Sequence, residues 1–398
     1  MGKIELDHTG SGSGVTLSSD GTDLLLDGTA IGGGGTALEL YAESPSSPTA
    51  PTVTGGTNSV SIGSGSVSDG TNSIAIGTNA DSNSGVAIGY NAQATSLYAT
   101  AIGADLSGNG AIGAGFGSVA LGASRAGGTD SFAAAIASNS ASYGATGANS
   151  VAIGDRAKAT AADGVAIGDT ALASGQGSLS LGRSGIASGT YSTAVGNDNV
   201  ASGGWSSAFG SYAETTATGS LALSTETSGY KTKATAVNAV AIGNRALSSI
   251  RSKLAYSGGA FSDNGDAQTG VFVLRSDTTD ATAEALTTNN STAGTDDQII
   301  LPNNSAYAFH GTIVARQQAS GGTASAAWKI EGLIRREGSA GTTVLVNSAT
   351  TVLDNTPGWG MALSADTTNG GLAITVTGAA STNIRWVATI HTSEVTYA

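Results

Sequence analysis

The sequence has no cysteine, only 5 prolines, and few charged or aromatic side chains, 11% and 5% of the 398 residues. Without cysteine there are no disulfides, no thiolate metal ligands and no cysteine nucleophile. Disordered segments are typically rich in proline, lysine and glutamate, so this composition favours an ordered chain. Because much of the apolar content is alanine, we expect few conventional cores of large side chains.

Basic side chains are also scarce: 16 Lys and Arg residues stand against 29 Asp and Glu residues, which gives a net charge of −13. Nucleic-acid binding needs a basic surface that displaces the counterions of the phosphates, and an anionic membrane surface would repel this chain. No apolar run approaches the roughly 18 residues of a membrane-spanning helix. Glu5 and Asp7 stand where the apolar part of a secretion signal would begin. We therefore expect no nucleic-acid partner, no membrane insertion and no secretion signal.

Glycine, in contrast, is abundant, with 60 residues, and much of it belongs to an internal repeat. The motif Asn-Ser-Val-Ala-Ile-Gly at 149–154 recurs in full or altered form between about 58 and 245. Its last position falls every 14 residues at 154, 168, 182, 196, 210 and 224. The large apolar residues of Val-Ala-Ile share one face of a strand, and glycines mark the turns. Each repeat therefore predicts two short strands and two turns, one coil of a narrow parallel β-solenoid.

The solenoid prediction assigns two sets of residues, one to the core of the repeats and one to their turns. We expect large apolar residues to fill the repeat core, namely Val151, Ile153, Val165, Ile167, Leu179, Leu181, Val240 and Ile242. We expect the repeat glycines to provide turns with positive φ, at Gly63, Gly77, Gly89, Gly154, Gly168, Gly182, Gly196, Gly210 and Gly243. The flank of alanine and glycine would then be exposed, so that several chains should associate to bury it, most simply as a homotrimer.

The unit at 149–154, with the Ala-x-Ala step at 157–159 and Gly164 after it, resembles the head repeats of trimeric autotransporter adhesins. The resemblance covers about residues 59–245. It implies a homotrimeric, left-handed parallel β-roll. The stretch 104–148 departs from the pattern, so the continuity of the coils is left open there.

The regions on either side of the repeats have a different composition. Strand candidates at 4–7, 15–17 and 23–27 predict a small N-terminal β module, and 246–254 is the one stretch expected to be helical. Six strand candidates after residue 270, separated by Gly, Asn and Asp turns, are typical of an all-β sandwich. The predicted order is a β module at 1–42, a Pro/Ser/Gly linker at 43–57, the solenoid at 58–245, a neck at 246–270 and a C-terminal sandwich head at 271–398.

This layout resembles a bacteriophage tail fibre or virion fibre, of a kind found in marine phages. The residues that carry the resemblance lie at 24–29, 308–316, 327–332 and 371–378. The resemblance implies a homotrimer on the virion that docks on a tail or capsid protein through residues 1–50. It also implies that the trimeric head binds a host-surface glycan or protein outside the cell.

Three alternatives are left open: a bacterial trimeric surface adhesin, a head-mounted decoration fibre and a glycan-cleaving spike. An adhesin would be expected to carry a secretion signal and a membrane anchor, which we do not find in the sequence. We therefore favour the phage fibre.

No residue pattern predicts chemistry. His8, His310 and His391 lack neighbours at metal-ligand spacing, although an ion on a three-fold axis is left open for the last two. The glycine-rich stretches lack the lysine of a phosphate loop, and no Gly-x-Ser-x-Gly elbow occurs. We therefore expect no enzyme activity, no cofactor and no metal. Candidate receptor contacts in the head are Trp359, Arg335 and Arg336.

Overall fold

The computed structural model describes residues 49–104, 108–134, 142–227, 229–318 and 322–397, with the backbone of five strands before residue 49. It divides into two units, 1–163 and 164–398, which are described separately. Four of the early strands form an antiparallel sheet in chain order: β1 (Ile4–Leu6), β2 (Val15–Ser19), β3 (Leu24–Leu26) and β4 (Thr29–Ala30). Three of them coincide with the predicted strands, whereas residues 43–48 of the predicted linker lie outside the described residues.

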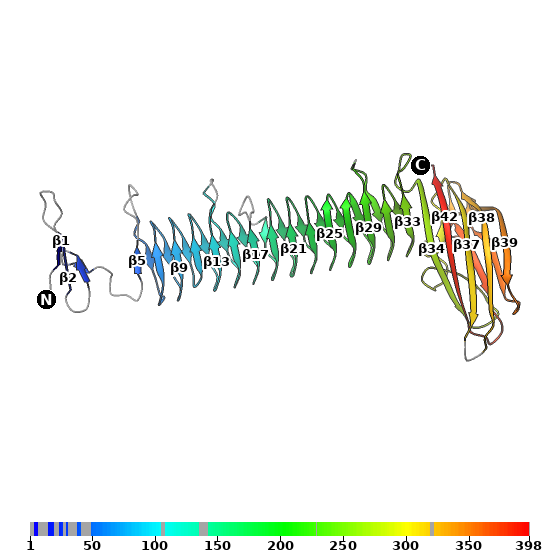
Figure 1. The fold of residues 1–398 in the computed structure, drawn as a ribbon, viewed down its shortest axis with the longest axis horizontal. Helices are drawn as coiled ribbons and strands as arrows, with labels where there is room; N and C mark the ends of the chain where they lie inside the picture. Colours follow the sequence, from blue (N-terminus) through cyan, green and yellow to red (C-terminus); the bar gives the residue numbers. More distant parts are fainter. Residues whose placement is uncertain are drawn as a thin grey trace. The chain divides into compact units, whose positions relative to one another are not determined.

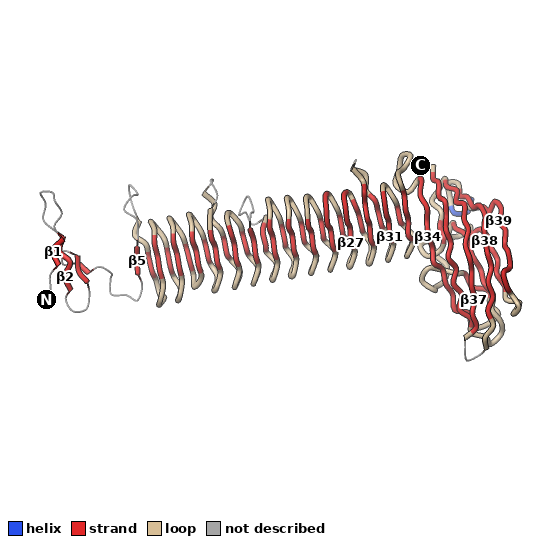
Figure 2. The backbone as a smooth tube through the Cα atoms, viewed as in Figure 1, coloured by secondary structure: helices blue, strands red, loops and turns tan. Residues whose placement is uncertain are grey.

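The first unit contains a β-solenoid in which each coil has a longer strand, a turn, a shorter strand and a second turn (Figures 1 and 2). The longer strands form one parallel ladder, called here the long-strand ladder. It comprises β5 (Leu38–Leu40), β7 (Val60–Ile62), β9 (Ile74–Ile76), β11 (Val86–Ile88), β13 (Thr100–Ile102), β15 (Val119–Leu121), β17 (Phe132–Ala134) and β19 (Val151–Ile153).

The shorter strands form a second parallel ladder, the short-strand ladder. In the first unit it comprises β6 (Thr52–Val53), β8 (Val67–Ser68), β10 (Asp81–Ser82), β12 (Gln93–Ala94), β14 (Ile112–Gly113), β16 (Arg125–Ala126), β18 (Gly144–Ala145) and β20 (Lys158–Ala159).

The second unit repeats both ladders. Its long-strand ladder comprises β21 (Val165–Ile167), β23 (Leu179–Leu181), β25 (Thr193–Asn197), β27 (Ser207–Ser211), β29 (Leu221–Thr225), β31 (Val240–Gly243) and β33 (Leu254–Ser257). Its short-strand ladder comprises β22 (Leu172–Ala173), β24 (Ile186–Ala187), β26 (Val200–Ala201), β28 (Ala213–Thr215), β30 (Thr232–Ala234) and β32 (Leu247–Ser248). The predicted parallel β-solenoid is confirmed.

Both ladders of the first unit persist through 104–148, where the sequence pattern is irregular. In this stretch β17 (Phe132–Ala134) pairs with β15 and β19 in the long-strand ladder. Residues 135–141 lie outside the described residues. β14, which ends at Gly113, belongs to the short-strand ladder. The ladder register therefore continues where the 14-residue period of the sequence does not.

The side chains that fill the interior of the coil are not the ones predicted from the sequence: the small residues face inward and the large apolar residues face outward. In β19 and β21 the middle alanines, Ala152 and Ala166, are fully buried, whereas the flanking valine and isoleucine are half-buried and point outward. The eight residues predicted as repeat core all lie on this outer side, and Leu181 is 41% exposed. A coil closed by such short strands leaves room only for small side chains, because protein interiors are close-packed.

The nine predicted turn glycines all have positive φ, from +96° to +129°. Six of them follow a strand directly, whereas Gly196, Gly210 and Gly243 lie within β25, β27 and β31 and not in turns. At Gly168 a Cβ atom would also lie 1.9 Å from the carbonyl oxygen of Gly182 in the next coil. Glycine at this corner is therefore required both by backbone conformation and by the close stacking of coils.

The predicted helix at 246–254 is wrong. Residues 247–257 form β32 and β33, which add one more coil to the solenoid. Ala246 and Ala255 are fully buried, in the alternating pattern of the earlier coils. Pairing with the previous coil thus overrides a weak local helix propensity.

The head consists of two sheets. The larger one is antiparallel from β33 onward, with the strand order β33, β34 (Ala267–Thr278), β42 (Ile384–Thr396), β37 (Ser305–Gln317), β38 (Ser325–Arg336) and β39 (Val344–Asp354). In the smaller sheet β35 (Ala283–Ala285), β36 (Ile299–Ile300) and β40 (Gly360–Asp366) pair with β41 (Gly371–Thr377). Large buried side chains, including Phe272, Ile330 and Trp386, form one core in the head, as expected for a sandwich.

Candidate functional site

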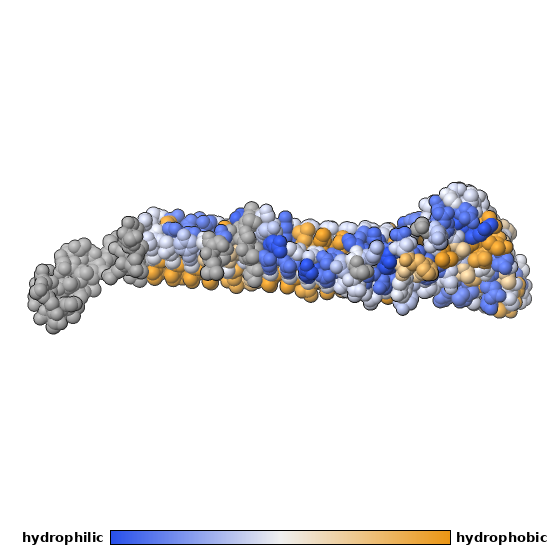
Figure 3. Space-filling view, turned by 90° about the horizontal axis from the view of Figure 1, so that it is seen from above, coloured by the Kyte–Doolittle hydropathy of each residue, from blue (hydrophilic) through white to orange (hydrophobic). Residues whose placement is uncertain are grey.

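Two columns of outward side chains follow the long-strand ladder, one on each side of the buried small residues; together they are called the apolar face. Figure 3 shows apolar atoms as an orange row along coils of the first unit. In that unit the face comprises Val60, Ile62, Ile74, Ile76, Val86, Ile88, Thr100, Ile102, Val119, Leu121, Phe132, Ala134, Val151 and Ile153. In the second it comprises Val165, Ile167, Leu179, Leu181, Thr193, Val195, Ser207, Phe209, Leu221, Leu223, Val240, Ile242, Leu254 and Tyr256.

The outer side of the short-strand ladder is more polar. It carries Asp81, Arg125 and Lys158 in the first unit and Glu214 and Lys233 in the second. Three successive coils of the second unit carry apolar residues there, namely Leu172, Ile186 and Val200. Burial, and then the negative charge of Asp69, raise the pKa of Asp81. A soluble monomer rarely exposes a continuous apolar patch, so the difference between the two ladders marks the apolar face as an interaction surface.

In the second unit the apolar face continues onto the large sheet of the head. The register places Leu254 opposite Val271, Val271 opposite His391, and His391 opposite His310. Further along the same sheet Val273 and Val314 are about half exposed. The imidazole rings of His310 and His391 stack with their centroids 5.3 Å apart. The strand register thus joins two histidines that show no motif in the sequence.

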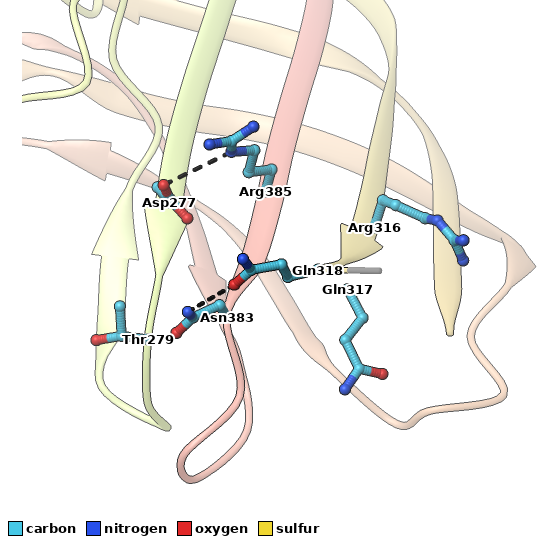
Figure 4. A pocket seen from close by; sticks show the side chains of 7 residues that line it. All are labelled: Asp277, Thr279, Arg316, Gln317, Gln318, Asn383 and Arg385. Atoms are coloured by element: carbon cyan, nitrogen blue, oxygen red, sulfur yellow. Dashed lines mark hydrogen bonds and ion pairs between the residues drawn. The ribbon is translucent and has the colours of Figure 1, made fainter. Parts of the chain in front are cut away.

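A polar pocket lies at one end of the strands of the large sheet, on the side away from the residues of β34 that pair with β33 (Figure 4). Its volume is about 530 Å³, and it lies between the ends of β34 and β37 and the start of β42. The lining residues are Asp277, Thr279, Arg316, Gln317, Gln318, Asn383 and Arg385. We call it the head pocket.

The head pocket combines guanidinium groups with side-chain amides. Arg385 Nε lies 3.7 Å from Asp277 Oδ2, and Asn383 Nδ2 donates to Gln318 Oε1 at 2.8 Å. Arg316 donates to the carbonyl oxygen of Thr323. Asp277 is the one carboxylate among the lining residues, so they do not supply the pair of carboxyl groups that glycoside hydrolysis requires. This set of donors and acceptors suits a ligand with hydroxyl or carboxylate groups.

Two of the three predicted receptor contacts have structural roles. Trp359 is only 6% exposed: its ring lies 5.8 Å from that of Trp386, and the Asn355 side chain bonds its backbone N–H and carbonyl at 2.9 and 2.8 Å. Arg336 is half-buried and donates to the carbonyl oxygen of Leu301 at 2.7 Å. The prediction is therefore corrected for these two residues. Arg335 is exposed beside Glu337 and stays a prediction.

A buried ion pair connects the last coil to the head. Lys253 Nζ lies 2.5 Å from Glu394 Oε2, and both side chains are almost fully buried. Burial lowers the pKa of Lys253, an effect that the charge of Glu394 opposes. Burial, and then Glu394, raise the pKa of Tyr307 well above its usual value. The sequence gives no sign of this pair, because the two residues are 141 positions apart.

Two further searches of the described residues give negative results. They contain no group of three or more His, Asp or Glu side chains placed to hold a metal ion. They also contain no helix with the length and apolar character needed to cross a membrane.

The repeat region is similar to a known family. The YadA head domain repeat matches residues 55–80, 82–105, 145–171, 161–184, 173–199, 187–213 and 228–246. The solenoid therefore carries adhesin-type head repeats, as the resemblance in the sequence implies. No curated protein matches the chain.

Among solved structures, the chain is similar to the crystal structure of the Acinetobacter baumannii phage AM24 tailspike protein. The two are 11% identical with a TM-score of 0.18, over 90% of this chain. This chain spans about 60% of the length of that protein. At this TM-score the similarity carries no argument about function.

Proposed function

We propose that the chain is a non-enzymatic, homotrimeric fibre of a phage virion. Residues 1–50 dock on a tail or capsid protein, the solenoid is the shaft, and the head binds a host-surface glycan or protein outside the cell. The observation that carries this proposal is the apolar face, which follows the long-strand ladder in both units.

The trimer follows from the placement of apolar residues on the coil. The interior is filled by alanine and serine, so it cannot also receive the large side chains of the apolar face. Three coils that turn this face toward a common axis would bury it completely, whereas the short-strand ladder, which carries the charged side chains, would stay in water. The match to the YadA head domain repeat also supports three chains, because the repeats resemble those of trimeric adhesins.

The head pocket supports the receptor role. Arg316 and Arg385 project side chains with several donors at the end of the sheet, beside amides that both donate and accept. Three such pockets in one trimer would engage a host surface together, so that a weak single contact becomes strong attachment. Arg335, exposed on β38, is a further candidate contact.

A bacterial surface adhesin is the second candidate, favoured by the head repeats themselves. Antibodies against the head would decide between the two by electron microscopy. The phage fibre predicts labelling of virions. Labelling of uninfected bacterial cells would support the adhesin instead.

The assembly is tested by light scattering on the purified chain. We expect a mass of three times 38.5 kDa. Leu181→Lys, which places charge on the apolar face, should give monomers, and Val200→Lys on the short-strand ladder is the matched control that should stay trimeric. A wild-type monomer would contradict the proposal.

The receptor role is tested on a glycan array probed with labelled trimer. Arg316→Gln and Arg385→Gln should each abolish the recognised spots, whereas Lys329→Gln, an exposed change outside the pocket, should leave them. Equal binding by all variants would show that the head pocket is not the receptor site. Release of reducing ends from a recognised polysaccharide would instead indicate a spike enzyme.

A further inference from the structure

Where the last coil meets the head, two polar side chains converge on one buried carboxylate oxygen of a third. Lys253 precedes β33, Gln268 lies on β34, and Glu394 lies on β42. Glu394 Oε2 accepts Lys253 Nζ at 2.5 Å and Gln268 Nε2 at 2.7 Å. The amine and the amide nitrogen therefore share one carboxylate oxygen, so they lie within two hydrogen-bond lengths of each other.

Burial acts against the charged form of Lys253, whose side chain is 3% exposed. The rings of Phe272 and Tyr307, 5.4 and 5.8 Å from its Nζ, and the carboxylate of Glu394 act in the opposite direction, because they attract the ammonium. Burial is the main influence on its pKa, which is lowered. A desolvated lysine that shares its proton with a carboxylate is a competent nucleophile.

The amide of Gln268 is fixed in place by the backbone of Leu247. The Leu247 N–H donates to Oε1 at 3.0 Å, and Nε2 donates to the Leu247 carbonyl at 3.0 Å. A backbone donor on the amide oxygen is the arrangement that stabilises the negative charge of a tetrahedral intermediate. The site thus brings together an amine, an acid–base carboxylate, a side-chain amide and a backbone donor to the amide oxygen.

We propose that Lys253 and Gln268 form an intrachain isopeptide bond, with Glu394 as the general base and general acid. Glu394 takes one proton from the Lys253 ammonium, and the freed electron pair attacks Cδ of Gln268. The carbonyl electrons move to Oε1. Glu394 then protonates Nε2 and takes a second proton from Nζ. When the carbonyl re-forms, the bond from Cδ to Nε2 breaks and ammonia leaves, without oxidation or reduction.

Acid–base chemistry assigns the acyl group to Gln268 and not to Glu394. Direct condensation of Lys253 with Glu394 would consume the carboxylate and would need a second acid–base group. The other described partners of Glu394 are the hydroxyls of Thr392 and Tyr307, not a carboxylate. The proposed bond would join the last coil to the first strand of the head, and it does not depend on the trimeric fibre.

The bond is tested by intact mass spectrometry of the denatured full-length protein. We expect a mass lower than that of the sequence by one ammonia molecule, and a tryptic peptide that joins residues 253 and 268. Lys253→Arg and Glu394→Gln should each restore the full mass. Lys231→Arg is the matched control: Lys231 forms a 2.9 Å ion pair with Glu214 in the same unit, and its loss should leave the ammonia deficit unchanged.

Three outcomes would overturn the proposal, and the first needs no variant. Folded wild-type protein at the full sequence mass contradicts it directly. An ammonia deficit that persists in Lys253→Arg would arise from a succinimide at an Asn–Gly step, such as Asn264–Gly265. A deficit of one water, with a peptide that joins 253 to 394, would place the bond on Glu394 instead.

Discussion

The shaft and the head of the second unit bury opposite kinds of side chain. The cluster inside the coils consists of alanines, such as Ala208 and Ala222, whereas the head core contains three tryptophans and many isoleucines and leucines. Large apolar residues of the shaft lie on its surface instead. The head can therefore be stabilised within one chain, and the shaft needs partner chains to bury its large side chains.

The difference follows from the geometry of the two regions. A coil with strands as short as two residues brings opposite walls so close that a methyl or hydroxymethyl group fills the space. Serine takes the place of alanine at Ser61 and Ser180, where its hydroxyl bonds inside the coil at 2.8 and 2.9 Å. The two sheets of the head stand farther apart, as sheets in sandwiches do, and need large side chains between them.

The largest expected effect is in the head core. Trp386→Ala should lower the free energy of unfolding of the head by about 3–5 kcal/mol, because it leaves a large cavity beside Trp328 and Trp359. Hydrogen exchange should show lost protection in head amides while shaft amides keep theirs. Equal loss in both regions would show that they unfold as one body.

The shaft should respond to the opposite change. Ala222→Leu adds volume inside a coil that has no space for it, and should cost about 1–3 kcal/mol. Ala222→Ser is the matched control and should change little, since Ser180 occupies the same place in its own coil. Urea denaturation measures the free energy of unfolding of both variants. An unchanged value for Ala222→Leu would mean that the coils can widen to accept the larger side chain.

The junction between the two regions should show a dependence on pH. Tyr307 has a pKa raised well above 10.0, first by burial and then by Glu394, so the folded chain keeps a proton that the unfolded chain releases near pH 10. Stability is therefore full below that pH and falls as the pH rises above it. Tyr307→Phe should make the free energy of unfolding depend less on pH in this range. It should also lower that free energy by about 1 kcal/mol near neutral pH, because a hydrogen bond is lost. Denaturation midpoints across this range are the measurement, and parallel curves would contradict the assignment.

The smallest effect is expected on the exposed surface of the head. Lys329 and Glu331 form a 3.4 Å ion pair with both side chains more than half exposed. Lys329→Ala should change the free energy of unfolding by at most about 1 kcal/mol, and less in high salt. Urea denaturation at two salt concentrations checks this. A larger decrease in the free energy of unfolding would indicate that an interface with another chain covers this ion pair.

The repeat, its turns and the strands of the head could be predicted because they depend on local pattern. The 14-residue repeat and the alternation in segments such as 307–316 indicate where strands lie, although strands such as β25 and β27 continue past their repeat glycine. The head pocket could not be predicted, because its residues have no motif and come from the ends of three strands. Trp359 follows Pro357 and Gly358, a turn signal that favours exposure, but packing of its ring against Trp386 buries it.

The sequence alone determined that this chain is an all-β repeat protein with a parallel solenoid followed by further β-strands toward the C-terminus. Only the tertiary structure decided which face of each coil is inside, because alternation in Val-Ala-Ile is the same for either orientation and the width of the coil selects alanine. The tertiary structure also brought Lys253, Gln268 and Glu394 together. Contacts between distant segments depend on sheet register, and a register set by the whole fold is not written in any short stretch of sequence.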